Sequence, residues 1–466
     1  MVLLDAEPAL LPSRILMAFT LGYHILLVPL GVALPTLTLV MEGIGLARKD
    51  GVALLIARRW SVVMGVQFAV GAVTGTILSF EFGILWPKML GRFGAAFGLG
   101  FAIEGWAFFL EAIFISIYLY GWNRLRPRTH FLLGLVLPPS GLLGAFGVLA
   151  ANSWMNTPGG VTLKPNGVLD VDVWAALFTK ALTYEFWHFT IAIYLTAGFA
   201  VASIYAVAWL RGRRDRYQRL AFGVPFTIAA ALAPVQWIVG DLSARALTFD
   251  QPAKFAAMEI TWQTRSNNPE VIGGLIDSGG NVHFGVAIPS LDSILVGLSP
   301  STIVRGLSSF AGNARPDAIE SNLTHLSFDL MVGLGTAALL LTVWYFAVLV
   351  RRRRLPESRS FYRLAALGGV GAYVTVEAGW VTTEVGRQPW IVYGAMRVAD
   401  AVTNASPVFL WSMLGTLIVV YAGIAFFFVT LLLRLSRRWR REDEAGGTEP
   451  SGARGLPYAP RPRAVE

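Results

Sequence analysis

The sequence contains no cysteine and few charged residues. Among its 466 residues only 14% are Asp, Glu, Lys or Arg, whereas 55% are hydrophobic. The lack of cysteine excludes disulfides, thiolate metal sites, iron–sulfur clusters and covalent c-type haem attachment. Any metal or redox cofactor must therefore be bound through His, Met, Glu or a similar side chain. The low charge, combined with repeated apolar runs of about twenty residues, excludes an ordinary soluble protein.

The apolar runs predict an all-α protein, a polytopic integral membrane bundle of about nine transmembrane helices. Each run is continuously apolar and does not alternate in ten-residue segments, which excludes a transmembrane β-barrel. The predicted spans are residues 14–40, 53–84, 93–120, 131–154, 175–210, 221–239, 326–350, 364–385 and 407–435.

Basic residues cluster in every second connection between these spans. Short loops rich in Lys and Arg stay on the cytoplasmic side of a membrane. We therefore expect the N-terminus outside and the C-terminus inside, and the net charge of +9 reflects topology and not a nucleic-acid partner. We expect a transmembrane domain over residues 1–440 and a disordered cytoplasmic tail over 441–466, which is rich in Gly, Pro and charge. The N-terminus has two acidic residues and no basic region, so no cleaved signal peptide is expected.

One outer connection, residues 241–325, is far longer than a turn, and loops of this length are usually functional or disordered. Asp250 and Pro252 predict the start of a short helix that continues through AKFAAMEI. Lys254 and Glu259 would lie about 140° apart on that helix, too far apart for a good ion pair, and so could bind a third group. The alternative is a solvated charged surface of the loop.

Two histidines, His24 and His188, fall within predicted spans, both toward the outer end. Neutral imidazole is the commonest metal ligand, and Met331 lies at a matching depth. His with Met is a known axial pair for haem. The alternatives are a hydrogen-bonded core histidine and a packing methionine.

Intramembrane carboxylates provide a second set of candidates, since burying them is costly and usually functional. Glu104 and Glu111 are seven residues apart, which places them two turns apart on nearly one helix face, as in a proton relay. Polar contacts that lock the bundle are the alternative. Glu185 and His188 form one Glu-x-x-His motif, but a bundle di-iron site needs the motif twice.

The stretch 377–397 combines two carboxylates, Glu377 and Glu384, with Arg387 at a predicted membrane boundary. Two interpretations are open for this stretch on the residues alone. It is either a proton or metal site covered by an arginine, or a helix end with snorkelling charges and a proline stop.

In their order, several motifs make the chain resemble subunit I of the cytochrome bd-type quinol oxidases, over essentially the whole range from Arg14 to about Arg440. The motifs are YHILLVPL (23–30), IEGWAFFLEAIF (103–114), EFWHF (185–189), GDLSAR (240–245) with QPAKFAAME (251–259), FDLMVGLG (328–335) and GWVTTEVGRQPW (379–390). Each motif is modest alone, and together they are highly specific.

The resemblance implies two haems b, one low-spin and one high-spin, and one haem d, whose place a third haem b could take. His188 and Met331 correspond to the axial ligands of the low-spin haem b. His24 and Glu384 correspond to ligands of the oxygen-reducing haem pair, with the assignment of each ligand to a haem left open. Glu104 corresponds to a residue at that haem pair.

The resemblance also implies which residues conduct protons and which bind quinol. Glu111 corresponds to a carboxylate on the proton route from the cytoplasm, and Lys254 and Glu259 to the quinol-binding residues of the outer loop, called the Q-loop. Residues packed around the haems correspond to Trp380, Arg387 and Arg14.

The implied function is that of the catalytic subunit of a terminal quinol oxidase in the bacterial inner (cytoplasmic) membrane, which reduces O2 to water and generates a proton motive force without pumping. Implied partners are oxidase subunit II and, as an optional component, a small single-helix subunit. The implied electron donor is ubiquinol or menaquinol. A haem b electron-transfer protein that does not reduce oxygen is the main rival. A proton-coupled transporter is disfavoured because it gives His24, His188 and Met331 no role and the spans show no evident repeat.

Two features depart from some family members. Asp329 stands where some members carry an arginine, and a negative charge there should lower the potential of the low-spin haem. In this respect the chain resembles sequences of the cyanide-insensitive branch. The Q-loop also lacks the long C-terminal insertion of some members.

Overall fold

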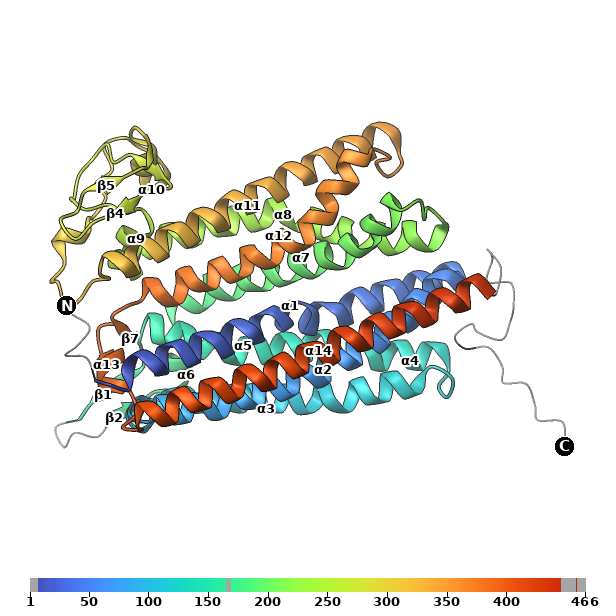
Figure 1. The fold of residues 1–466 in the computed structure, drawn as a ribbon, viewed down its shortest axis with the longest axis horizontal. Helices are drawn as coiled ribbons and strands as arrows, with labels where there is room; N and C mark the ends of the chain where they lie inside the picture. The colour runs from blue at the N-terminus through green and yellow to red at the C-terminus, as the bar shows by residue number, and fades with distance from the viewer. Residues whose placement is uncertain (1–6, 165–168, 446–457, 459–466) are drawn as a thin grey trace.

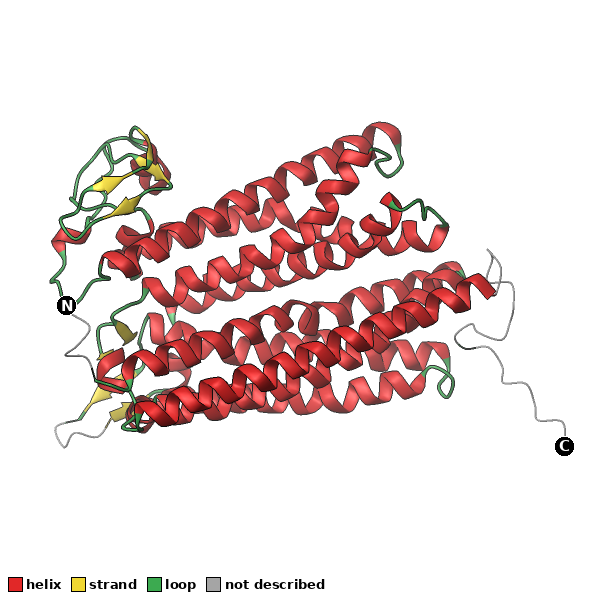
Figure 2. Ribbon diagram, viewed as in Figure 1, coloured by secondary structure: helices red, strands yellow, loops and turns green. Residues whose placement is uncertain are grey.

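The computed structural model describes residues 7–164, 169–445 and 458, and long helices dominate it (Figures 1 and 2). Within the described residues, nine helical segments are long and apolar enough to cross a membrane, which confirms the predicted fold class. Eight are continuous helices, and α4 with α5 makes up the ninth. These helices are α1 (Leu10–Arg48), α2 (Gly51–Leu85), α3 (Pro87–Gly121), α4 (Pro127–Gly134), α5 (Leu137–Asn156), α7 (Lys180–Leu210), α8 (Arg216–Asp250), α11 (Ala318–Arg352), α12 (Arg359–Gly386) and α14 (Pro407–Ala445).

Side-chain caps fix several helix starts. The carboxylate of Asp50 accepts hydrogen bonds from the first amides of α2, as N-cap residues commonly do. Asp317 and Glu320 form a reciprocal capping box at the start of α11. These polar caps begin the helices before the apolar runs begin, so helices extend beyond the predicted spans.

Two histidines that fall outside the predicted spans lie inside helices of the structure. His130 lies in α4 and His325 in α11, and both side chains are fully buried. The expectation that only His24 and His188 lie within spans was therefore wrong. Both misses arise at span boundaries, because apolar runs that begin at 131 and 326 place the preceding histidine just outside.

The bundle consists of two groups of helices in contact. In one, α7 packs against α8 and α12, and α11 packs against α12. In the other, α1 packs against α2 and α14, and α3 packs against α5. The two groups meet where α7 contacts α1 and α5. The basic connections α1–α2, α3–α4, α7–α8 and α11–α12 lie together at one end of the bundle (Figure 1, right).

The opposite end carries the Q-loop and two smaller hairpin segments (Figure 1, left). Between α8 and α11 lie α9 (Pro252–Met258), β3 (Glu270–Ile272), β4 (Leu275–Ile276), β5 (Val282–His283), β6 (Val286–Ile288), α10 (Leu291–Gly297) and the 3-10 turn η1 (Leu307–Ser309). Antiparallel pairs form between β3 and β6 and between β4 and β5. The smaller segments are β1 (Val161–Leu163), β2 (Leu169–Val171) and α6 (Val173–Leu177), and β7 (Trp390–Val392), β8 (Met396–Arg397) and α13 (Val398–Ala401).

The start of the Q-loop differs from its prediction. Because α8 continues to Asp250, the loop begins at Gln251 and not at residue 241. Asp250 is the last residue of α8 and Gln251 holds the N-cap position of α9 without a side-chain cap, although Pro252 does occupy the first turn. α9 ends at Met258, so Glu259 stands just beyond the helix.

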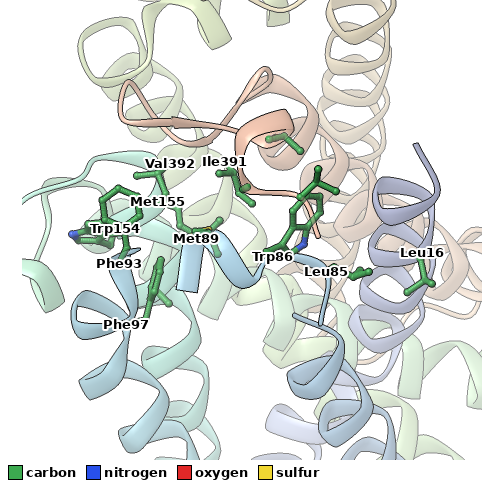
Figure 3. Packing of buried hydrophobic residues seen from close by; sticks show 14 of the residues in the cluster. Leu16, Leu85, Trp86, Met89, Phe93, Phe97, Trp154, Met155, Ile391 and Val392 are labelled. Atoms are coloured by element: carbon green, nitrogen blue, oxygen red, sulfur yellow. The ribbon is translucent and has the colours of Figure 1, made fainter. Parts of the chain in front are cut away.

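A core of large side chains holds the Q-loop end of the bundle together (Figure 3). Trp154 is fully buried and packs edge-on against Phe97, while Trp86 fills the junction between α2 and α3. Backbone bonds from Tyr393 to Met155 and from Thr403 to Leu85 attach the segment after α12 to this core. The end of α12 is therefore held firmly in place.

The C-terminal segment is partly helical. α14 continues to Ala445, so the first five residues of the predicted disordered tail are helical. Tyr458 is described as well, and its hydroxyl lies 2.5 Å from Glu42 Oε1. The other residues of the predicted tail, 446–457 and 459–466, lie outside the described residues.

Candidate functional site

His188 and Met331 lie in neighbouring parts of the same helix group. His188 stands on α7 beside Gly240 of α8, where a Cβ would lie 3.4 Å from His188 Cε1. Met331 stands on α11 beside Gly379 of α12, where a Cβ would lie 2.8 Å from Met331 Sδ. Both side chains are only half-buried although they lie inside the bundle. The glycines make room for the two side chains to lie against α8 and α12. Each side chain keeps exposed surface inside the bundle, and His and Met are a known axial pair, so these residues fit a haem.

Polar atoms near His188 are incompletely paired. The side-chain amide nitrogen of Gln236 lies 3.2 Å from His188 Nδ1 and 3.3 Å from Nε2. One amide cannot bond well to two nitrogens of one ring, and Gln236 Oε1 is buried without a hydrogen-bond partner among the described residues. His188 therefore keeps a ring nitrogen for a ligand.

The tautomer of His24 follows from its hydrogen bond. His24 Nδ1 lies 2.9 Å from Oγ1 of Thr74 on α2. The single hydroxyl proton of Thr74 is directed at the backbone carbonyls of Val70 and Gly71, so Oγ1 accepts from Nδ1–H. Nε2 is then unprotonated and free to bind iron, which is the usual arrangement for a histidine ligand held by a second residue.

Glu384 is held by two donors at the end of α12. Its Oε1 accepts from Asn152 Nδ2 at 2.8 Å and its Oε2 from Arg387 at 2.5 Å. The Arg387 side chain is 4% exposed and that of Glu384 is 26% exposed. The two donors fix the orientation of the carboxylate, as hydrogen-bonding neighbours commonly do for a carboxylate that ligates a metal.

The same hydrogen-bond network reaches the Q-loop through Asn156. Asn156 Oδ1 accepts from Arg387 at 3.2 Å and lies 3.5 Å from Lys254 Nζ. Its Nδ2 donates to Glu185 at 2.7 Å and to Asn152 at 3.0 Å. This buried amide thus joins the candidate quinol lysine to the candidate haem ligand Glu384.

Three further predicted residues lie at this end with different surroundings. Trp380 Nε1 is buried without a hydrogen-bond partner among the described residues, as is Glu377 Oε1. A Cβ at Gly22 of α1 would lie 3.5 Å from the second oxygen of Glu377. Arg14 instead forms an ion pair of 3.0 Å with Glu320 of α11, and its side chain is 38% exposed.

Glu104 and Glu111 both face α5. A Cβ at Gly147 would lie 3.2 Å from Glu104 Cβ, and a Cβ at Gly141 would lie 3.7 Å from Glu111 Oε1. Both carboxylates are therefore on the α5 face of α3, as their seven-residue spacing predicts. The structure brings neither into a salt bridge among the described residues.

Lys254 and Glu259 are both buried, 3% and 5% exposed, and their side chains have different partners. Burial lowers the pKa of Lys254 to about 7, and nearby Arg387 adds to the effect, while Glu185 and Glu384 oppose it. Burial raises the pKa of Glu259 well above its usual range, and the neighbouring Glu270 raises it further. The predicted lack of a mutual ion pair is confirmed among the described residues.

Sequence reasoning missed the carboxylates that surround Glu259. One oxygen from each of Glu259, Glu270 and Asp292 lies within 4.8 Å of the other two. Burial and Asp292 raise the pKa of Glu270 to about 7. Loop residues without periodicity gave no signal that these three carboxylates meet.

Asp329 and His325 of α11 both contact the Q-loop. The backbone amide of Gly273 in the Q-loop donates to Asp329 Oδ2 at 2.5 Å. His325 Nδ1 lies 2.6 Å from the carbonyl oxygen of Met258, and Nε2 lies 2.9 Å from that of Gly273. Both side chains therefore fasten the Q-loop to α11.

Known proteins are similar to this chain in sequence and in fold. Residues 12–439 match the family described as cytochrome bd terminal oxidase subunit I. The chain is 31% identical to the putative cytochrome bd menaquinol oxidase subunit I of Bacillus subtilis (90% of this chain, 95% of that protein) and 28% identical to the cytochrome bd-II ubiquinol oxidase subunit 1 of Escherichia coli (82% and 87%). The structure of bd oxidase from Geobacillus thermodenitrificans superimposes with a TM-score of 0.86 at 32% identity, over 93% of this chain and 100% of that one. The chain therefore belongs to the cytochrome bd terminal oxidase subunit I family, the catalytic subunits of membrane quinol oxidases.

Proposed function

We propose that this subunit oxidises quinol at the Q-loop, near Lys254 and Glu259, and reduces O2 to water near His24 and Glu384. The observation that carries this assignment is the buried hydrogen-bond network from Lys254 through Asn156 to Glu384. Through this network, Lys254, which could bind a quinol oxygen, is connected to Glu384, which could ligate an iron.

The ligand assignments follow from the donor set. His188 and Met331 would hold a low-spin haem b, and His24 and Glu384 would serve the high-spin haem b and the haem d, or a third haem b. Glu104 lies on the same α5 face of α3 as Glu111 and would line the oxygen site. Trp380 of α12 would pack around the haems. Bound haems supply the one-electron chemistry between quinol and O2.

The remaining residues bind, orient and move protons. Lys254, when charged, would donate a hydrogen bond to a quinol oxygen, and Glu259 with Glu270 would accept the protons that quinol releases. Arg387 and Asn152 hold the Glu384 carboxylate in place. Glu111 would pass protons to Glu104, and Arg14 would fix the start of α1 against α11 through Glu320.

Sidedness follows from the basic connections, which lie at the end opposite the Q-loop (Figure 1). The positive-inside rule places that end in the cytoplasm and the Q-loop outside. Quinol protons would then be released outside while protons for water are taken from inside, which generates a proton motive force without pumping. We further propose assembly with oxidase subunit II and a small single-helix subunit, and ubiquinol or menaquinol as donor. The related subunits carry either quinol in their names.

Oxygen consumption by the purified complex tests this assignment. Lys254→Gln should raise the KM for quinol and leave the haem spectrum intact, whereas Lys164→Gln, an exposed lysine paired with Asp170, should match the wild type. An unchanged quinol KM in Lys254→Gln would remove Lys254 from the quinol site. Pigment extraction from the same preparation decides between haem d and a third haem b.

A further inference from the structure

A fully buried polar cluster lies at the basic end of the bundle, far from the Q-loop. Its members are Glu42 of α1, Tyr118 of α3 and His130 of α4, which are 0%, 1% and 0% exposed. Tyr118 donates its hydroxyl proton to Glu42 Oε2, and His130 Nδ1 lies 2.9 Å from Glu42 Oε1. Nothing in the function proposed above uses these groups.

The hydrogen bonds of His130 determine how many protons the cluster holds. Nε2 lies 2.9 Å from the carbonyl oxygen of Tyr118, which only accepts, so Nε2 carries a proton. Nδ1 faces both Glu42 Oε1 and the Tyr458 hydroxyl, which lies 2.5 Å from Oε1 and 2.7 Å from Nδ1. A further proton taken up by the pair can sit on the imidazole, giving an ion pair, or on the carboxyl, giving two neutral groups. The cluster can therefore hold one exchangeable proton, and the side chains of Glu42 and His130 are fully buried.

Helix geometry links this cluster to the predicted proton route. Glu104, Glu111 and Tyr118 follow each other at intervals of seven residues along α3. Seven residues correspond to about 10 Å of rise and nearly two full turns, so all three side chains leave α3 on one face. The cluster therefore stands at the basic end of the carboxylate series.

α1 adds a buried hydroxyl one turn from Glu42. Thr38, one turn before Glu42 on α1, is 1% exposed, and its hydroxyl has no hydrogen-bond partner among the described residues. A buried hydroxyl of this kind can hold a water molecule or pass on a proton. A stability role alone is a poor explanation for the Glu42–His130 pair, because buried ion pairs seldom add net stability.

We propose that Glu42 and His130, with Tyr118, form a proton-loading site that supplies Glu111 from the basic end of the bundle. This inference rests on the proposed oxidase function. The Tyr118 hydroxyl first turns away from Glu42 and releases its proton toward Glu111 through intervening water, and the Tyr118 oxygen then takes up the proton of the Glu42 carboxyl. The pair then regains one proton from the solvent at the basic end, so one proton enters for each one delivered.

The groups that face this proton come from several elements. Tyr118 approaches from α3 and Trp122 from the position just after α3, and the centroid of the Trp122 ring lies 4.3 Å from that of His130. Glu42 approaches from α1, and the hydroxyl of Tyr458 lies 2.7 Å from His130 Nδ1. Both tyrosines can pass a proton to or from the pair.

The test replaces both titratable groups while it keeps their hydrogen bonds. In the complex carrying Glu42→Gln with His130→Gln, turnover per haem should fall about tenfold or more at pH 9, where protons are scarce. The solvent deuterium isotope effect on turnover should rise. The haem spectrum, the KM for quinol and anaerobic haem reduction by quinol should stay unchanged, because they need no proton from this end. Tyr118→Phe, which removes only one hydroxyl, should show a smaller loss of the same kind.

Asp50→Asn is the matched control, a buried carboxylate at the same end that pairs with Arg216 and can keep its helix cap as Asn. It should behave as the wild type. Wild-type turnover, pH profile and isotope effect in the double amide variant would overturn the proposal, and so would loss of the haem spectrum, which would mark the pair as structural. A wild-type complex that consumes no oxygen with quinol would refute the proposed function itself.

Discussion

The protonation of Lys254 should set the pH dependence of quinol binding. Lys254 is 3% exposed, and its pKa of about 7 stands against an ordinary value of 10.5. Only the charged form donates a strong hydrogen bond to a quinol oxygen. Binding strength is therefore fully present below pH 7 and is lost as the pH rises through that value.

The size of the effect follows from the titration curve. With a pKa of about 7, about 90% of Lys254 is charged at pH 6 and about 10% at pH 8. If only the charged form binds quinol well, the apparent KM should be about tenfold higher at pH 8 than at pH 6. A lysine with an ordinary pKa would show no change over this range.

The assay is steady-state oxygen consumption against quinol concentration between pH 6 and 9. Glu185 raises the pKa of Lys254, so Glu185→Gln should move the KM rise to lower pH. Lys254→Gln should remove the rise, whereas Lys164→Gln should retain it. A KM that is flat from pH 6 to 8 in the wild type, or an undiminished rise in Lys254→Gln, would refute the reasoning.

Three further predictions concern the ligands and the exit of quinol protons. His188→Ala should abolish the low-spin haem b signal in reduced-minus-oxidised spectra, with His283→Ala, an exposed histidine of β5, as control; an unchanged spectrum would exclude His188 as ligand. Thr74→Val removes the bond that fixes the His24 tautomer and should weaken haem retention by about 10- to 100-fold in a haem-transfer assay, while Thr76→Val, exposed and on the same helix, should have no effect. Glu270→Gln should slow quinol oxidation above pH 7, where the wild-type carboxyl is ionised and accepts protons, and equal rates at pH 8 would argue against that role.

The nine spans could be predicted because apolar runs of membrane length leave few alternatives. Helix ends were harder, since polar residues can continue a helix beyond the lipid. Asp241 and Arg245, for example, form an ion pair within the outer turns of α8, where the sequence suggested a loop. The same effect moved His325 into α11, four residues before Asp329.

Individual site residues could be predicted from sequence motifs, but the hydrogen bonds and contacts between them could not. Asn152 and Glu384 are 232 residues apart in sequence and yet form a hydrogen bond. Asn156 makes four polar contacts. In the sequence, however, an asparagine at this position indicates only the end of a helix. Glu270 meets Glu259 only because β3 pairs with β6 and α9 ends at Met258.

Asp329 is the residue for which sequence and structure give different expectations. From the sequence, its negative charge should lower the potential of the low-spin haem. In the structure its partners are the Gly273 amide and His325, whose Nε2 lies 3.5 Å from Asp329 Oδ2. His325 in turn contacts the carbonyl oxygens of Met258 and Gly273. The Asp329 carboxylate is thus engaged with Q-loop groups, so its main effect should be to hold the Q-loop.

Asp329→Asn separates the two expectations. A hydrogen bond to a charged acceptor contributes about 1.5–3 kcal/mol, so its loss should make local opening of the Q-loop about 10- to 150-fold more frequent. Hydrogen exchange at Gly273 should quicken accordingly and the quinol KM should rise, with little change in haem potential. Asp277→Asn, which breaks the exposed Asp277–His283 pair in the same loop, is the control. If the haem potential rises while hydrogen exchange at Gly273 stays as in the wild type, Asp329 acts through its charge. A side chain that holds the Q-loop by a hydrogen bond could not be replaced without faster exchange at Gly273.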